Sequence, residues 1–90
     1  MIKKIIDNAG TMTDLITSAI LLSGLQFENQ KKIIFGLTPT NIEVEIQNFR
    51  QKLINQVSAE ATEMSDEKIY EIARQIALYF IAKSIKTPFH

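Results

Sequence analysis

The residue types that carry most enzyme chemistry are sparse in this chain, and their spacing matches no catalytic or metal-binding motif. The one histidine, His90, is the last residue, so neither a serine–histidine–aspartate triad nor an H-E-x-x-H zinc site can be assembled. Residues 7–14, DNAGTMTD, begin like a calcium loop, but Ala9 stands at the third position, where a ligand is required. The chain has no cysteine. We therefore expect no metal and no cofactor.

Two pairs of carboxylates are close enough in sequence to suggest a general acid and a general base. These are Glu60 with Glu63 and Glu67 with Glu71. We expect both pairs to lie on solvated surfaces, because nothing around them predicts a buried pocket that would shift a pKa. The glycines stand apart from one another, without the lysine or the glycine-rich pattern of a phosphate-binding loop. We therefore expect a protein that is not an enzyme.

Base recognition by a helix-turn-helix is a second possibility, and it rests on residues 12–35. A helix over 12–23, a turn at Gly24 and a helix over 27–35 would have suitable lengths. The second of these helices offers polar side chains for bases and phosphates: Glu28, Asn29, Gln30, Lys31 and Lys32. Ten basic and ten acidic residues nevertheless give zero net charge, and a nucleic-acid binder usually shows a basic excess. Nucleic acid is therefore an alternative partner and not the leading one.

Composition predicts one domain over residues 1–90, held together by packing alone. The hydrophobic fraction of 46% is that of an ordinary globular chain. The absence of cysteine favours a reducing compartment, and we expect the cytoplasm. Residues 15–25, LITSAILLSGL, are too short to span a bilayer, and no cleavage site follows them. A peripheral membrane protein that uses its N-terminal apolar segments is the third hypothesis, and composition does not favour it because a polybasic segment is lacking.

Apolar periodicity predicts helices over most of the chain. In the first half we expect helices over 2–9 and 12–23, the latter capped by Thr11 with Asp14, and a short helix or connector over 27–36. In the second half Thr38-Pro39 precedes a long stripe, which comprises Ile42, Ile46, Phe49, Leu53 and Val57.

The last helix has a clear start and a clear end. Ser65 is an N-cap followed by Asp66 and Glu67, and Thr87-Pro88 should end the helix at about Lys86. The short link at 62–64 predicts that this helix folds back on the one before it. The expected fold is therefore an all-α bundle of four to five helices, with a long C-terminal antiparallel hairpin formed by residues 40–61 and 66–86.

Apolar residues occur on two faces of the last helix. Ile69, Ala73, Ile76 and Phe80 form one stripe, which we expect in the core. A second stripe lies elsewhere on the helix and consists of Leu78, Ile81 and Ile85, with Arg74 one turn before Leu78. Either the first helices of the chain cover this second stripe, or a partner does.

The leading functional hypothesis follows from that second stripe. We expect a non-enzymatic protein-interaction module, such as an adaptor, an inhibitor or an assembly subunit, that binds a protein partner or forms a homo-oligomer. The expected interface residues are Arg74, Leu78, Ile81, Ile85 and Val44, the last from the preceding helix. A whole helix face is needed, because Leu78 and Ile85 alone would gain only about 1.5–3 kcal/mol each on burial.

Overall fold

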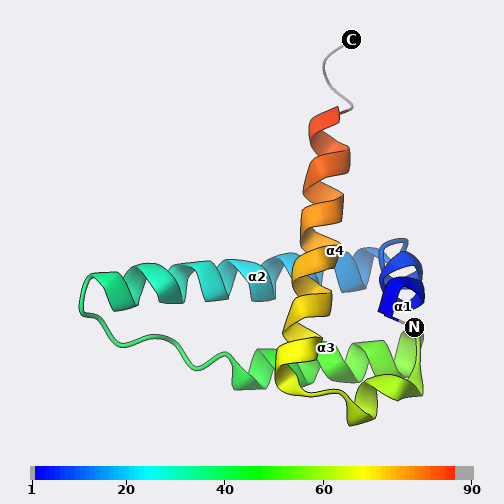
Figure 1. The fold of residues 1–90 in the computed structure, drawn as a ribbon, viewed down its shortest axis with the longest axis horizontal. Coiled ribbons are helices and arrows are strands. Elements are labelled where there is room, and N and C mark those ends of the chain that lie inside the picture. Colours follow the sequence, from blue (N-terminus) through cyan, green and yellow to red (C-terminus); the bar gives the residue numbers. More distant parts are fainter. Residues whose placement is uncertain (1, 87–90) are drawn as a thin grey trace.

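The computed structural model of the protein describes residues 2–86, with side-chain surroundings for residues 3–84. Within these residues the chain forms four α-helices and one short 3-10 helix, without a strand, and the all-α class is confirmed (Figure 1). In chain order the elements are α1 (Ile2–Ala9), α2 (Thr13–Ile34), α3 (Glu43–Gln56), the 3-10 helix η1 (Ala59–Glu63) and α4 (Asp66–Lys86). The stop signal expected at 87–88 lies outside the described residues.

Of the three longer helices, α2 and α3 lie antiparallel and α4 crosses both. Figure 1 shows α2 and α3 extending in opposite directions along the long axis of the molecule, whereas α4 lies across both of them. The most extensive packing is between α2 and α4, and α1 also packs on α4. The predicted antiparallel hairpin of 40–61 with 66–86 is not confirmed, because η1 redirects the chain and α4 crosses α3. The antiparallel neighbours are α2 and α3, which residues 35–42 connect.

Helix α2 is a single helix where the sequence predicts two shorter segments separated by a turn. Gly24 lies within it, and beyond its neighbouring residues and the backbone of the helix itself no atom lies within 4 Å of the position that a Cβ would occupy there. A glycine in a helix costs only about 1 kcal/mol relative to alanine, so the apolar burial along the same helix is enough to keep it continuous. The predicted cap at Thr11 is also wrong, since its hydroxyl donates to the carbonyl of Asn8 and the N-cap position is Met12.

Helix α3 is shorter than the predicted span of 40–61. Thr40 does not begin it, because the backbone of Thr40 is bonded to the side chain of Asn29 in α2. The side chain of Asn41 accepts instead from the N–H of Glu43, at the start of the helix. At the other end the carbonyl of Leu53 accepts from two successive N–H groups, those of residues 57 and 58, and the helix stops there.

Apolar side chains from every element form one core. The stripe predicted on α3 contributes Ile46, Phe49 and Leu53, and the start of the stripe predicted on α4 is buried as expected. Phe80, which the periodicity places in the core, is instead 41% exposed. Because α2 crosses α4 instead of following it, the fully buried positions of α4 end at Ala77, and every described residue from Leu78 to Ser84 is exposed. The core residues are Ile5, Ala9, Leu15, Ala19, Leu22, Ile46, Phe49, Leu53, Ala61, Ile69, Ile72, Ala73 and Ile76.

Arg50 fastens α3 to the segment that redirects the chain into α4. Its guanidinium donates to the carbonyls of Ala61 and Met64 and to the carboxylate of Asp66, and its Nε donates to Gln47. The side chain is only 13% exposed, so these bonds are partly shielded from water. Charge-assisted bonds from one planar group to several acceptors fix direction as well as distance. Arg50 therefore helps to set the angle at which α4 leaves α3.

Candidate functional site

The described residues hold no arrangement suited to metal binding. No group of three His, Cys, Asp or Glu side chains among residues 2–86 could hold a metal ion. The four carboxylates considered as acid–base pairs, Glu60, Glu63, Glu67 and Glu71, are all exposed.

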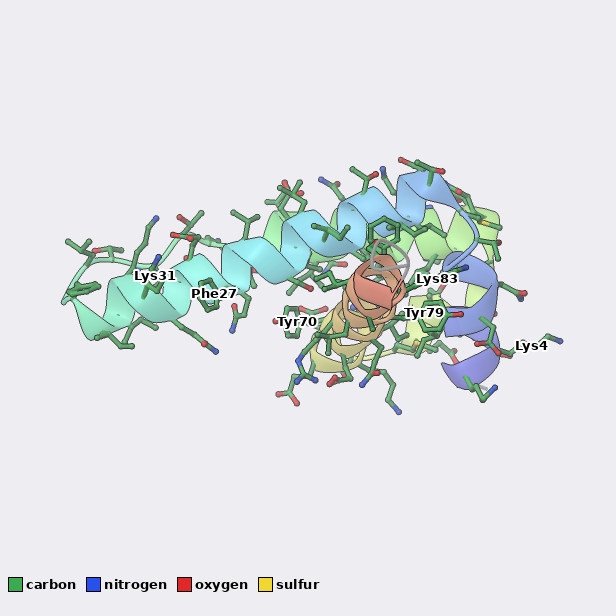
Figure 2. All side chains as sticks on the ribbon, turned by 90° about the horizontal axis from the view of Figure 1, so that it is seen from above. Lys4, Phe27, Lys31, Tyr70, Tyr79 and Lys83 are labelled. Atoms are coloured by element: carbon green, nitrogen blue, oxygen red, sulfur yellow. The ribbon has the colours of Figure 1, made fainter. Side chains whose placement is uncertain are left out.

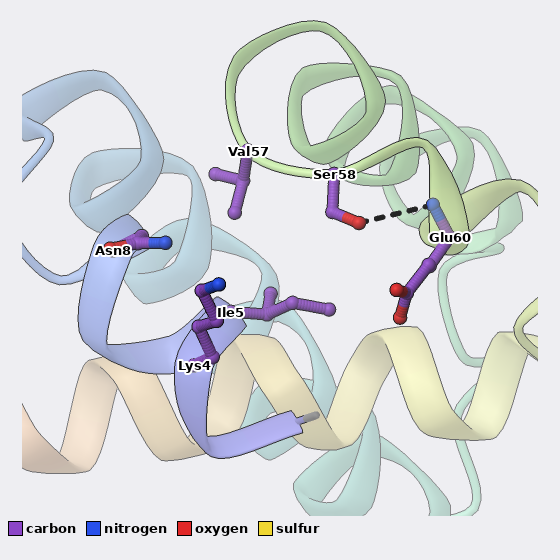
Figure 3. A pocket seen from close by; sticks show the side chains of 6 residues that line it. All are labelled: Lys4, Ile5, Asn8, Val57, Ser58 and Glu60. Carbon is purple, nitrogen blue, oxygen red and sulfur yellow. Dashed lines mark hydrogen bonds between the residues drawn. The ribbon is translucent and has the colours of Figure 1, made fainter.

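A small pocket lies between α1 and the connection from α3 to η1 (Figure 3). Its volume is about 180 Å³, and Lys4, Ile5, Asn8, Val57, Ser58 and Glu60 line it. The Ser58 hydroxyl accepts from the N–H of Glu60 at 3.2 Å, which caps the start of η1. This polar lining therefore serves the local backbone, and Lys4 at its rim is exposed.

A larger groove lies where α4 crosses α2, and it contains the residues predicted as an interface. Arg74, Leu78 and Ile81 line it, in a volume of about 400 Å³. Leu78 is 48% exposed and Ile81 is 46% exposed, so the chain itself covers only about half of each side chain. Val44 is exposed on α3 but does not line this groove. Ile85 lies outside the residues whose side chains are described.

Helix α2 contributes the opposite wall of the groove, which sequence reasoning missed. Its lining residues are Ser23, Gln26, Phe27 and Gln30, and Tyr70 from the first half of α4 joins them. Figure 2 shows Phe27 and Tyr70 on the same side of α4. Because periodicity predicts a separate short element over 27–36, no sequence signal places Phe27 opposite Leu78.

The polar groups around this groove are nearly balanced in charge. Arg74 pairs with Glu71 one turn earlier, with 3.1 Å between Nη1 and Oε2, and the two glutamines on α2 are neutral. The Ser23 hydroxyl is buried and has no hydrogen-bond partner among the described residues. An apolar floor with an uncharged or paired rim is the usual composition of a protein–protein interface.

The opposite side of α4 is also apolar and open. Tyr79 and Phe80 face a depression of about 370 Å³ that Gly10 and Ile16 also line. In Figure 2, Tyr79 and Lys83 lie on the side of α4 that faces α1, away from Phe27. Leu78, Tyr79, Phe80 and Ile81, hereafter the α4 ridge, are therefore four successive exposed residues that surround most of the helix.

The helix-turn-helix considered as an alternative over 12–35 does not form, because α2 runs without interruption through residues 13–34. Asn29, one of the side chains offered for base contacts, is only 7% exposed and is bonded to Thr40. The segment therefore lacks the separate recognition helix on which the DNA-binding alternative depends.

Comparison with protein-family models, with curated proteins and with solved structures finds no match for this chain. Among the described residues, no helix has both the length and the apolar character needed to cross a membrane.

Proposed function

We propose that this protein is a non-enzymatic interaction module that self-associates through the α4 ridge and the groove between α2 and α4. The observation that carries the proposal is the exposure of four successive large apolar residues, Leu78–Ile81, on the half of α4 that projects beyond α2 (Figure 1). A helix that is apolar all round is normally an interior helix. On this helix the chain buries side chains fully only up to Ala77 and leaves the next four partly exposed.

The exposed apolar area is a little over half of what a standard interface buries on each partner. A large side chain exposes about 150–250 Å² when free, so Phe27 and the α4 ridge together expose roughly 500 Å² of side chain. A standard interface buries about 800 Å² on each partner. The polar rim, including Arg74 and the α2 glutamines, would supply the remainder.

A second copy of the chain is the partner that best fits this surface. In a two-fold symmetric contact the same patch meets itself, so the ridge of each copy would enter the groove of the other. In that arrangement the second copy would cover the α4 ridge on more than one side of the helix. A partner with a flat surface would cover only one side. Zero net charge also lowers the repulsion between copies.

The substitution of Leu78→Glu together with Ile81→Glu tests the proposal. Both positions are half exposed within one chain, so glutamates there should leave the fold intact and oppose an apolar contact. Light scattering should give twice the chain mass for the wild type and the single-chain mass for the double variant. Circular dichroism should show the same helicity for both.

Gln75→Glu is the matched control, because it adds a negative charge to an exposed position of α4 that does not line the groove. It should retain the wild-type mass. A wild-type protein that stays monomeric at high concentration would contradict self-association. A double variant that loses its helicity would show that the ridge stabilises the single chain.

A further inference from the structure

The two most exposed large apolar side chains among the described residues, Ile34 and Phe35, lie with two others at a second place, remote from α4. Ile33, Ile34, Phe35 and Leu37, hereafter the α2 tip, are between 60% and 78% exposed. Figure 1 shows the end of α2 and the following turn at one extremity of the long axis, away from α1 and α4. The α2 tip is therefore a convex projection and not part of the groove.

The backbone of the α2 tip is held in a defined turn. The N–H of Leu37 donates to the carbonyl of Lys32 at 2.7 Å, and the N–H of Gly36 donates to that of Ile33 at 3.1 Å. These two bonds are the Schellman pattern that ends a helix. It requires a left-handed residue, and Gly36 has a φ of 74°. The four apolar side chains thus stand outward on an ordered turn.

Polar bonds close the base of the same turn. The Asn29 amide donates to the carbonyl of Thr40 at 2.6 Å and accepts from its N–H at 2.8 Å. Lys32 Nζ donates to the Thr40 hydroxyl at 2.8 Å. The nearly buried amide of Asn29 therefore holds the turn in place, and the apolar side chains of the α2 tip point away from it. Such an arrangement leaves the α2 tip available for contact with a membrane or another molecule.

The charge around the α2 tip indicates what it would meet. Residues 29–42 contain Lys31 and Lys32 and no acidic residue. Lys31 lies at the surface, with its Nζ 3.8 Å from Glu28 Oε1 and 5.6 Å from the ring centroid of Phe27. Because all three side chains are exposed, Lys31 can exchange these contacts for others.

We propose that the α2 tip inserts into the headgroup region of an anionic lipid bilayer, with the exposed Lys31 against the lipid phosphates. A convex apolar tip needs a concave partner or a surface that deforms around it, and lipid does the latter. Apolar side chains beside basic ones are typical of segments that lie in the membrane interface. Because a polybasic segment is lacking, the apolar side chains would supply most of the affinity and the lysine a smaller preference for anionic lipid. The proposal does not depend on self-association through α4, although two copies would bring two tips to one membrane.

Co-sedimentation of the full chain with vesicles tests this proposal. The wild type should bind vesicles that contain phosphatidylglycerol and should bind pure phosphatidylcholine vesicles at least several-fold more weakly. Ile34→Ser with Phe35→Ser should reduce partitioning about 100-fold, since each side chain contributes about tenfold. Leu21→Ser is the matched control, because it removes an exposed apolar side chain from the same helix outside the α2 tip, and it should bind like the wild type.

Fluorescence identifies which surface enters the lipid. The chain has no tryptophan, so Phe35→Trp provides a single reporter at the α2 tip and Tyr79→Trp a single reporter on the α4 ridge. Only the Phe35→Trp emission should shift to shorter wavelength with anionic vesicles. A shift confined to Tyr79→Trp, or no vesicle binding by the wild type, would overturn the proposal, as would equal binding by the Ile34→Ser, Phe35→Ser variant.

Discussion

Asp14 joins the first turn of α2 to the last turns of α3. Its Oδ1 accepts from Lys52 Nζ at 2.8 Å and its Oδ2 accepts from Gln56 Nε2 at 3.1 Å. These hydrogen bonds, with that from Lys52 the larger, lower the pKa of Asp14 below its ordinary value of 3.8. The charged form is therefore favoured in the folded state, and this link contributes to stability while Asp14 is ionised.

The pH dependence of that contribution is a testable prediction. Because the folded-state pKa is depressed, the unfolded chain binds more protons as the pH falls below 3.8, and the contribution is lost there. At neutral pH, Asp14→Asn should melt at a lower temperature than the wild type. As the pH falls below 3.8, the two melting temperatures should converge.

Lys52→Met provides the background that isolates the pair. In that background Asp14→Asn should cause a smaller pH-dependent difference in melting temperature, because the main partner is gone. If the wild type and Asp14→Asn differ in melting temperature by a constant amount down to the lowest pH, the prediction is wrong.

Sequence reasoning finds residues whose role depends on near neighbours and misses those whose partners are distant. Ser65 is predicted to cap α4, and its hydroxyl accepts from the N–H of Lys68 three residues on. Asp14 is expected to cap its own helix, but its partners lie 38 and 42 residues away. Asn29 is offered for base contacts and so is expected at the surface, but it bonds to Thr40, 11 positions along the chain. No local signal predicts the role of Arg50, which donates to the carbonyls of Ala61 and Met64.

At the level of helices, periodicity locates α1, α4 and the buried stripe of α3. It does not predict the continuity of α2, because glycine is a turn signal and only tertiary packing decides otherwise. It also cannot predict the crossing of α4 over α2. That crossing explains why Phe80 is exposed and why Phe27 faces the groove. The groove residues on α4, Arg74, Leu78 and Ile81, are predictable from the periodicity of their own helix. Those on α2 are not, because they depend on the crossing.

Two glycine substitutions should have opposite effects on the free energy of unfolding. Gly24→Ala places a methyl group in open space within a helix and should stabilise the protein by about 0.5–1 kcal/mol. Gly36→Ala places alanine at a φ of 74° and should destabilise it by about 1 kcal/mol. Urea denaturation followed by circular dichroism measures both. A destabilising Gly24→Ala would show that α2 is not continuous at this position.

As a whole, the molecule is more open than a single-chain bundle of its size. Its accessible surface is 6229 Å², against about 5,300 Å² from the scaling for a compact monomer. The radius of gyration is 13.9 Å, compared with about 12 Å for a compact domain. Its shortest extent of 19 Å corresponds to two layers of helices of about 10 Å each. The α4 ridge and the α2 tip, with large apolar side chains 41–78% exposed, contribute to this additional surface.

This openness makes a prediction about stability and concentration. If two copies cover each other's α4 ridge, unfolding is coupled to dissociation and the melting temperature must depend on protein concentration. A tenfold dilution changes the free energy of coupled dissociation and unfolding by about 1.4 kcal/mol. For the combined length of two chains, this lowers the melting temperature by about 3–5 °C.

The Leu78→Glu, Ile81→Glu variant should melt at a lower temperature that does not change on dilution. The Ile34→Ser, Phe35→Ser variant should keep the concentration dependence of the wild type. Calorimetry over a hundredfold range of concentration measures all three, and a wild-type melting temperature that is constant over that range would contradict the covering of the α4 ridge by a second copy.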